Sequence, residues 1–210
     1  MSGRRLLTIN TGSSSLKAAL YRLWEDATET LELRVEASRI GDRGSALRLV
    51  DARGETLDER QDDLPDHAAA LDALLSWLRD RGIDDLLAAV GHRIVHGGDR
   101  YREPQRVAPE VVADLRALVL IDPNHLPQAI AAIEAVGRAY PAVPQVVCFD
   151  TAFHSRMPRV ARLYALPRRL AEEGIIRYGF HGLSYEYVVG ELRRIDRAAY
   201  DGRVVVAHLG

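Results

Sequence analysis

Hydrophobic and polar residues alternate along the first quarter of the chain in the pattern of β-strands. Residues 4–10 are predicted to form a short buried strand, and from Leu16 onward apolar residues alternate with Lys17 and its neighbours at a period of two. This period predicts that Lys17 points away from the sheet face that carries Leu16. Residues 30–40 and 46–51 continue the pattern, with glycines marking turns near them, so we expect the chain to open with an antiparallel meander.

Near residue 66 the pattern changes to the 3.6-residue period of helices. Asp66 can cap a helix over residues 67–81, whose leucines recur on one face. Beyond it we expect helices over 109–118, 127–139 and 184–195, and strands over 86–95, 145–150 and 203–208. An antiparallel opening followed by alternating helices and strands predicts an α/β fold, a mixed sheet with helices on both faces.

The polar clusters of the sequence follow the expected strands. They lie at residues 10–17, 93–98 and 150–154 and from His208 onward. Because ligands of α/β sheets bind at strand ends, these clusters hold the candidate site residues.

The composition argues against several kinds of partner. The formal net charge is −2, from 28 basic and 30 acidic side chains, which does not suit nucleic acid or an anionic membrane. No apolar run approaches the roughly 18 residues needed to span a bilayer. Cys148 is the only cysteine, so we expect no internal disulfide and interpret Cys148 as a small core residue. The expected compartment is the cytoplasm.

Lys17 is the one lysine among the 28 basic side chains. It follows the turn sequence Gly-Ser-Ser-Ser at residues 12–15, whose backbone N–H groups and hydroxyls suit phosphate oxygens. A compact ammonium group there supplies a point charge that the planar fork of arginine does not reproduce. The alternative is a polar hairpin turn with a lysine that binds no ligand.

Three other residues stand where chemistry is expected. Arg93 lies inside an apolar strand and needs an anionic partner, which is either an acid of this chain or a bound carboxylate or phosphate. Asp150 ends a buried strand, where a carboxylate either handles Mg²⁺ or a proton or caps a turn. His181 lies in a glycine-rich loop and is either structural or close to a ligand. The sequence has no P-loop, nucleophile elbow or zinc-binding motif.

Five segments together resemble the acetate kinase family, which includes acetate, propionate and butyrate kinases. They are residues 10–17, 91–98, 149–154, 178–182 and the last motif that starts at His208. The resemblance implies the RNase H-like fold of the actin, Hsp70 and sugar-kinase superfold. It also implies an N-terminal domain over residues 1–150 and, over 151–210, the beginning of a nucleotide-binding domain.

The resemblance implies direct in-line transfer of the γ-phosphoryl group of ATP to a short-chain carboxylate, acetate in the first place, giving an acyl phosphate and ADP. Mg²⁺ or Mn²⁺ is the implied cofactor. Of the residues, Asn10 resembles the metal ligand, and Asp150 and His181 resemble the catalytic pair. The other implied roles are substrate binding by Arg93, Val95, His125 and Phe180, and binding of the ATP phosphates by Ser13, Ser15, Lys17, His208, Leu209 and Gly210.

The sequence departs from the family pattern in three places, and at one of them it reads Gly182-Leu-Ser-Tyr instead of the usual Gly-Thr-Ser-His. Where the family usually reads Ala-Pro-Leu-His-Asn-Pro, this chain reads Asp122-Pro-Asn-His-Leu-Pro, so the polar Asn124 replaces an apolar pocket residue. We therefore expect a larger or more polar acid than acetate among the substrates. The rest of the family's nucleotide site and most of its homodimer interface would lie beyond Gly210, so we expect little or no kinase activity from these 210 residues alone.

Three alternatives remain open at this point. One is a kinase that prefers propionate, butyrate or another short-chain acid. Another is a non-catalytic half-kinase or partner subunit. The third is a regulatory ATPase of the actin and Hsp70 type, and Arg93 and His181 argue against it, because attack by water requires no grip on a carboxylate.

Overall fold

The computed structural model describes residues 3–26, 28–61 and 63–209. The strands are β1 (Arg4–Thr11), β2 (Ser15–Leu23), β3 (Glu29–Ser38), β4 (Ala46–Asp51), β5 (Thr56–Gln61), β6 (Leu87–Ile94), β7 (Gln105–Arg106) and β8 (Gln145–Phe149). The α-helices are α1 (His67–Arg79), α2 (Pro109–Ala117), α3 (Leu126–Ala139), α4 (Arg159–Arg162), α5 (Arg168–Glu172), α6 (Gly182–Ile195) and α7 (Arg197–Tyr200). Short 3₁₀ helices lie at Asp84–Leu86 and Phe153–Arg156.

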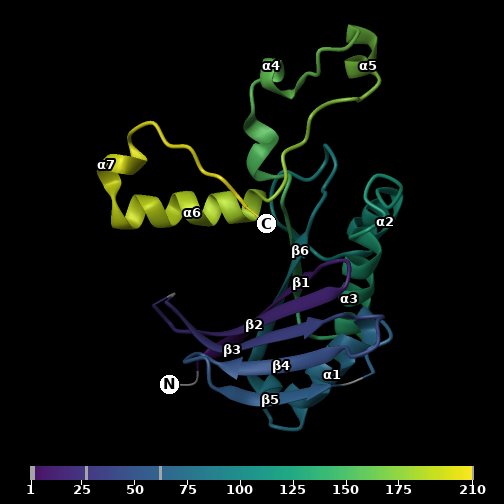
Figure 1. The fold of residues 1–210 in the computed structure, drawn as a ribbon, viewed down its shortest axis with the longest axis vertical. Coiled ribbons are helices and arrows are strands. Elements are labelled where there is room, and N and C mark those ends of the chain that lie inside the picture. The colour runs from purple at the N-terminus through teal and green to yellow at the C-terminus, as the bar shows by residue number, and fades with distance from the viewer. Residues whose placement is uncertain (1–2, 27, 62, 210) are drawn as a thin grey trace. The chain divides into compact units, whose positions relative to one another are not determined.

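The strands form one sheet in the order β5-β4-β3-β2-β1-β6-β8-β7. The first five strands are an antiparallel meander, as the alternation predicts, and they lie side by side in Figure 1. β6 then joins β1 in parallel, so that the sheet is mixed. This arrangement of a mixed sheet with helices confirms the α/β fold predicted from the sequence.

The described residues divide into two units. The first unit covers Met1–Ile94 and Gln105–Val147, and the second covers Val95–Pro104 and Cys148–Gly210. The division of the chain into domains at residue 150 stays a prediction.

In the first unit, α1 and α3 pack on one face of the sheet. The core consists of alternate strand residues and the apolar sides of the two helices, and its buried leucines include Leu7, Leu16, Leu20, Leu33, Leu47, Leu49, Leu71, Leu74, Leu75 and Leu78. Asp66 caps α1 as predicted, because its Oδ1 accepts a hydrogen bond from the backbone N–H of Ala69 at 2.9 Å. The predicted orientation of Lys17 is also confirmed, since Leu16 is fully buried and the Lys17 side chain is 63% exposed.

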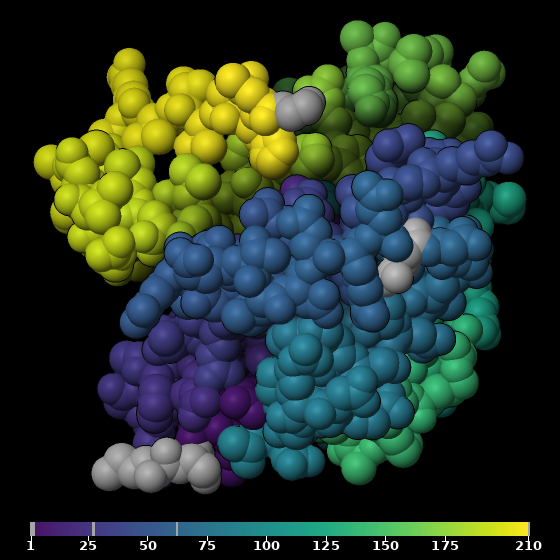
Figure 2. Space-filling model, turned by 60° about the horizontal axis from the view of Figure 1, so that its bottom comes forward, coloured from purple at the N-terminus to yellow at the C-terminus, as the bar shows by residue number. Residues whose placement is uncertain are grey.

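The opposite face of strands β2, β3 and β4 carries polar and charged residues. The outermost strand, β5, was not predicted, and its residues are mostly exposed. Its sequence, Thr-Leu-Asp-Glu-Arg-Gln, has one apolar residue and so lacks an alternating signal. Figure 2 shows this edge of the sheet, in blue, at the surface.

In the second unit, the longest element is α6. It begins at Gly182, two residues before the predicted start at Ser184, and its N-cap residue is His181. The predicted strand over residues 203–208 is wrong: the described part of this segment forms no strand, and Val205 is 94% exposed. An apolar β-branched run becomes a strand only when a neighbouring strand supplies hydrogen bonds.

Within residues 3–26, 28–61 and 63–209, none of the helices has both the length and the apolar character needed to cross a membrane.

Candidate functional site

The turn between β1 and β2 is built tightly around Gly12. Its N–H donates to the Ser15 carbonyl at 2.8 Å, and its own carbonyl lies 2.8 Å from Nε2 of His67 at the start of α1. A Cβ on Gly12 would lie 2.7 Å from the Ser15 Oγ, so a larger residue here would require the Ser15 hydroxyl to move. Ser13 is exposed and Ser15 is half-buried, which leaves the predicted phosphate-binding hydroxyls at the surface of the turn.

Asn10, Lys17 and Arg93 share one face of the sheet, opposite the core. Asn10 and Lys17 are direct partners across β1 and β2. Arg93 follows His92, the residue of β6 that pairs with Ile9, and its Nη1 donates to the Asn10 Oδ1 at 2.9 Å. The structure therefore brings together three predicted site residues from three neighbouring strands. In this contact Arg93 donates to a neutral amide oxygen, whose second lone pair can accept a further hydrogen bond.

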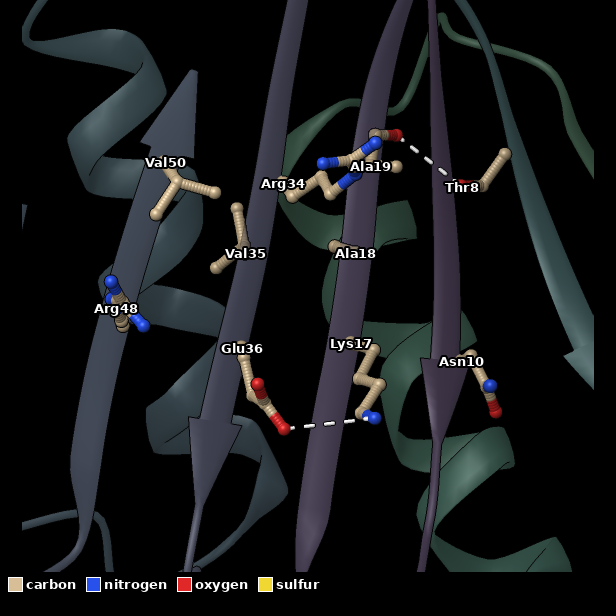
Figure 3. Close-up of a pocket in the computed structure, with 10 residues that line it drawn as sticks. All are labelled: Thr8, Asn10, Lys17, Ala18, Ala19, Arg34, Val35, Glu36, Arg48 and Val50. Atoms are coloured by element: carbon tan, nitrogen blue, oxygen red, sulfur yellow. Dashed lines mark hydrogen bonds and ion pairs between the residues drawn. The ribbon is translucent and has the colours of Figure 1, made fainter. Parts of the chain in front are cut away.

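An open pocket of about 400 Å³ lies on this polar face, and Asn10 and Lys17 line it (Figure 3). The other lining residues are Thr8, Ala18, Ala19, Arg34, Val35, Glu36, Arg48 and Val50. Lys17 Nζ lies 3.6 Å from the Glu36 carboxylate, and both side chains are more than half exposed. Such an exposed pair contributes little to stability, so the ammonium group can exchange Glu36 for an anionic ligand at little cost.

His125 stands at the start of α3, as the residue immediately before the helix. Its Nδ1 lies 2.8 Å from the Asp122 Oδ1. Sequence analysis did not single out Asp122. The sequence feature that could have indicated this residue is an aspartate three residues before a histidine, in a turn next to proline. Side chains at this spacing meet on one helical turn.

In the second unit, Asp150 and the start of α6 are joined through the backbone. Asp150 is 1% exposed, and its carbonyl accepts the Gly182 N–H at 3.1 Å. A Cβ on Gly182 would lie 2.0 Å from that carbonyl oxygen, so only glycine permits this approach. The preceding residue, His181, adopts the left-handed conformation with φ of 55°. This conformation is uncommon for residues other than glycine. Such backbone conformations are concentrated at functional sites, which agrees with the predicted role of His181.

His181 and His208 lie together in the second unit. Their rings are stacked, with centroids 4.2 Å apart and planes 6° from parallel. Nδ1 of His208 also lies 3.2 Å from the Ser184 Oγ. Leu209 is 91% exposed, and Gly210 lies outside the described residues.

Val95 and Phe180, the predicted acyl-tail residues, flank a buried histidine that sequence analysis did not identify. Val95 is half-buried and precedes His96, which is 2% exposed. The His96 ring lies 5.7 Å from the ring of Phe180 and 4.5 Å from that of Tyr178. The N–H of Gly98 donates to its Nδ1 at 2.9 Å. His96 thus packs against Phe180, which is 43% exposed.

Burial raises the pKa of the Cys148 thiol, and the negative charge of Glu186 adds to the effect. A raised pKa disfavours the reactive thiolate, in agreement with the interpretation of Cys148 as a packing residue.

Comparisons with known proteins agree with the resemblance seen in the sequence. Residues 5–210 match the model of the Acetokinase family. An acetate kinase from Rhodopseudomonas palustris is 46% identical over 210 residues, which cover 98% of this chain and 52% of that protein. An acetate kinase from Methylocella silvestris is 43% identical over 215 residues, covering 99% of this chain and 53% of the relative.

Solved structures of the same family have a similar fold. The acetate kinase of Porphyromonas gingivalis superposes with a TM-score of 0.80 at 33% identity, over 94% of this chain and 50% of that one. A propionate kinase from Francisella tularensis gives 0.81 at 27% identity, over 91% and 49%. The chain spans about half the length of the curated relatives it matches. The match of the family model over nearly the whole sequence shows that this chain belongs to the acetokinase family.

Proposed function

We propose that this chain is part of a kinase that transfers the γ-phosphoryl group of ATP to a short-chain carboxylate and forms an acyl phosphate and ADP. The observation that carries the proposal is the family match over residues 5–210. It is supported by the arrangement of Asn10, Lys17 and Arg93 on one face of the sheet.

Arg93 is proposed to bind the carboxylate of the substrate. Its guanidinium can form two parallel hydrogen bonds with a carboxylate, and Asn10 orients it through the bond at 2.9 Å. His125 would contribute to substrate binding, and Val95 and Phe180 would line the pocket for the acyl tail. The substrate acid is proposed to extend beyond acetate, because the exposed Asn124 stands where the family has an apolar residue.

The bond-making step requires little proton transfer, because a carboxylate oxygen is already a nucleophile. That oxygen attacks the γ-phosphorus while the bond from phosphorus to the bridging oxygen of ADP breaks. Catalysis therefore depends on alignment and on neutralising the charge of the phosphoryl oxygens. Lys17, Ser13, Ser15 and the residues from His208 to Gly210 would hold the phosphates. His181 would stabilise the phosphoryl group in flight, and Asp150 would act as the catalytic carboxylate.

The residues present have the right chemistry for Mg²⁺ or Mn²⁺. Both ions prefer oxygen ligands, and Mg²⁺ keeps several waters and binds substrate phosphates rather than an all-protein cage. Asn10 offers an amide oxygen and Asp150 a carboxylate. Among the residues that the structure describes, no group of three or more His, Cys, Asp or Glu side chains is placed to hold a metal. A bound metal ion would neutralise phosphate charge.

We also propose that the complete protein is a cytoplasmic homodimer that binds small molecules and no nucleic acid. The single cysteine and the net charge of −2 support the compartment and the absence of a nucleic-acid partner.

A chimera tests the proposed function. This chain would replace the matching half of the Rhodopseudomonas palustris acetate kinase, to which it is 46% identical. The chimera is expected to form acyl phosphate from ATP and a short-chain acid. Asp150→Asn is expected to reduce kcat on the order of 10²- to 10⁴-fold, the usual contribution of a catalytic acid or base.

A folded chimera that forms no acyl phosphate with any short-chain acid would favour the non-catalytic alternative. The 210-residue chain assayed alone, with ATP and acetate, tests the separate expectation that it has little or no activity.

A further inference from the structure

Asp122 and His125 form a hydrogen-bonded pair in the turn that leads into α3. Asp122 Oδ1 lies 2.8 Å from Nδ1 of His125, and the Asp122 carbonyl accepts the N–H of Leu126 at 3.3 Å. This backbone bond closes one helical turn and holds the two side chains on the same side of it. Since an ionised carboxylate only accepts hydrogen bonds, Nδ1 of His125 must carry the proton of this contact.

The environment of Asp122 makes this contact restrictive. The aspartate side chain is 13% exposed, and its Oδ2 is buried without a hydrogen-bond partner in the described part of the chain. A carboxylate that has lost water from one oxygen depends on the donor at the other. Turning the His125 ring would remove the donor from Oδ1 while Oδ2 also lacks one. The contact with Asp122 therefore holds the orientation of the His125 ring.

The imidazole itself remains accessible. The His125 side chain is 40% exposed, and its contact with Asp122 uses only Nδ1. The second ring nitrogen, Nε2, is therefore the atom that can meet a ligand. To donate to an anionic oxygen from Nε2, the ring must be protonated at both nitrogens, and a nearby carboxylate is the counter-charge that such a cation requires.

We infer that Asp122 is a positioning residue for His125: it fixes a proton on Nδ1 and presents Nε2 to a carboxylate or phosphoryl oxygen of the substrate. The inference rests on the proposed function, which places His125 in the substrate site.

Nitrogen NMR of histidine-labelled chain tests the pair directly. At a pH where His125 is neutral, we expect Nδ1 to be protonated and Nε2 to be bare. Asp122→Ala removes the acceptor, so the His125 signals should shift toward the opposite tautomer. Asp122→Asn keeps an acceptor oxygen of the same geometry and should restore the protonated Nδ1. It also keeps the test usable if the alanine variant does not fold.

His67 is the internal control in the same spectra. Its Nε2 lies 2.8 Å from the Gly12 carbonyl, so its proton is on Nε2 and should stay there in both variants. A bare Nδ1 on His125 in the unmodified chain, or His125 signals that are unchanged in a folded Asp122→Ala variant, would overturn the inference. The spectra require no turnover, so they separate this inference from the proposed kinase activity, which the chimera tests.

Discussion

Arg93 and Asn10 are 83 residues apart in sequence and are joined by a hydrogen bond of 2.9 Å between Nη1 and Oδ1. The bond links two neighbouring parallel strands and aims a guanidinium along the polar face of the sheet. Strand β6 thus carries a cation to the site residues of β1 and β2.

Replacing Arg93 by lysine should weaken binding of the carboxylate substrate in the chimera. Lysine keeps the charge but loses the planar fork, and charge-assisted hydrogen bonds contribute roughly 1.5–3 kcal/mol, so KM for the acid should rise roughly 10- to 100-fold. Kinetics with varied acid concentration measure this. Arg53→Lys, at an exposed turn position that does not line the pocket, is the control and should leave KM unchanged. If the Arg93→Lys variant and the control variant had the same KM for the acid, the result would contradict a carboxylate-binding role for Arg93.

Gly182→Ala should destabilise the second unit. The added Cβ would lie 2.0 Å from the Asp150 carbonyl oxygen and 2.8 Å from the Phe153 Cβ, and overpacking of this kind costs about 1–3 kcal/mol. Chemical denaturation measures the loss. Gly190→Ala is the control in the same helix, because nothing lies within 4 Å of its added Cβ. Alanine is the better helix former, so this variant should gain up to about 1 kcal/mol.

His92 should make the stability of the first unit depend on pH. It is 3% exposed, and its Nε2 donates to the Gln145 Oε1 at 2.8 Å. Burial lowers the pKa of His92 from 6.5 to about 4, although the bond to Gln145 opposes this. Above pH 6.5 the histidine is neutral in both the folded and the unfolded chain, so it does not change the free energy of unfolding with pH. As the pH falls from 6.5 to 4, the unfolded chain takes up the proton first, so up to about 3 kcal/mol of stability is lost.

Urea unfolding of the chain and of His92→Gln between pH 7 and 4 measures this term. The variant should lose less stability across the window than the unmodified chain. Identical pH profiles would show that His92 is not the group responsible.

Asn124 should influence the choice of acid. It replaces the apolar residue of the family pattern, and Asn124→Leu should shift the preference of the chimera toward acetate roughly 10-fold, the scale of one favourable apolar contact in a pocket. The measurement is kcat/KM across a series of acids from acetate to larger and hydroxylated ones. Acetate as the clearly preferred acid of the unmodified chimera would show that Asn124 does not select the substrate.

The sequence alone was sufficient for features that depend on near neighbours. The alternation around Leu16 and Lys17 predicted the meander and the exposed side of Lys17, because strand geometry repeats every two residues. Asp66 was predicted as a helix cap because capping involves residues three apart. The motifs also indicated the acetokinase family, which the comparisons show.

Only the tertiary structure decided which distant groups meet. The bond between Arg93 and Asn10 depends on β6 pairing with β1. The contact of Gly182 with Asp150, and the absence of a strand over the described residues of 203–208, likewise depend on non-local packing. Local patterns do not encode these outcomes, because strand pairing and close approach are set by partners far away in the chain.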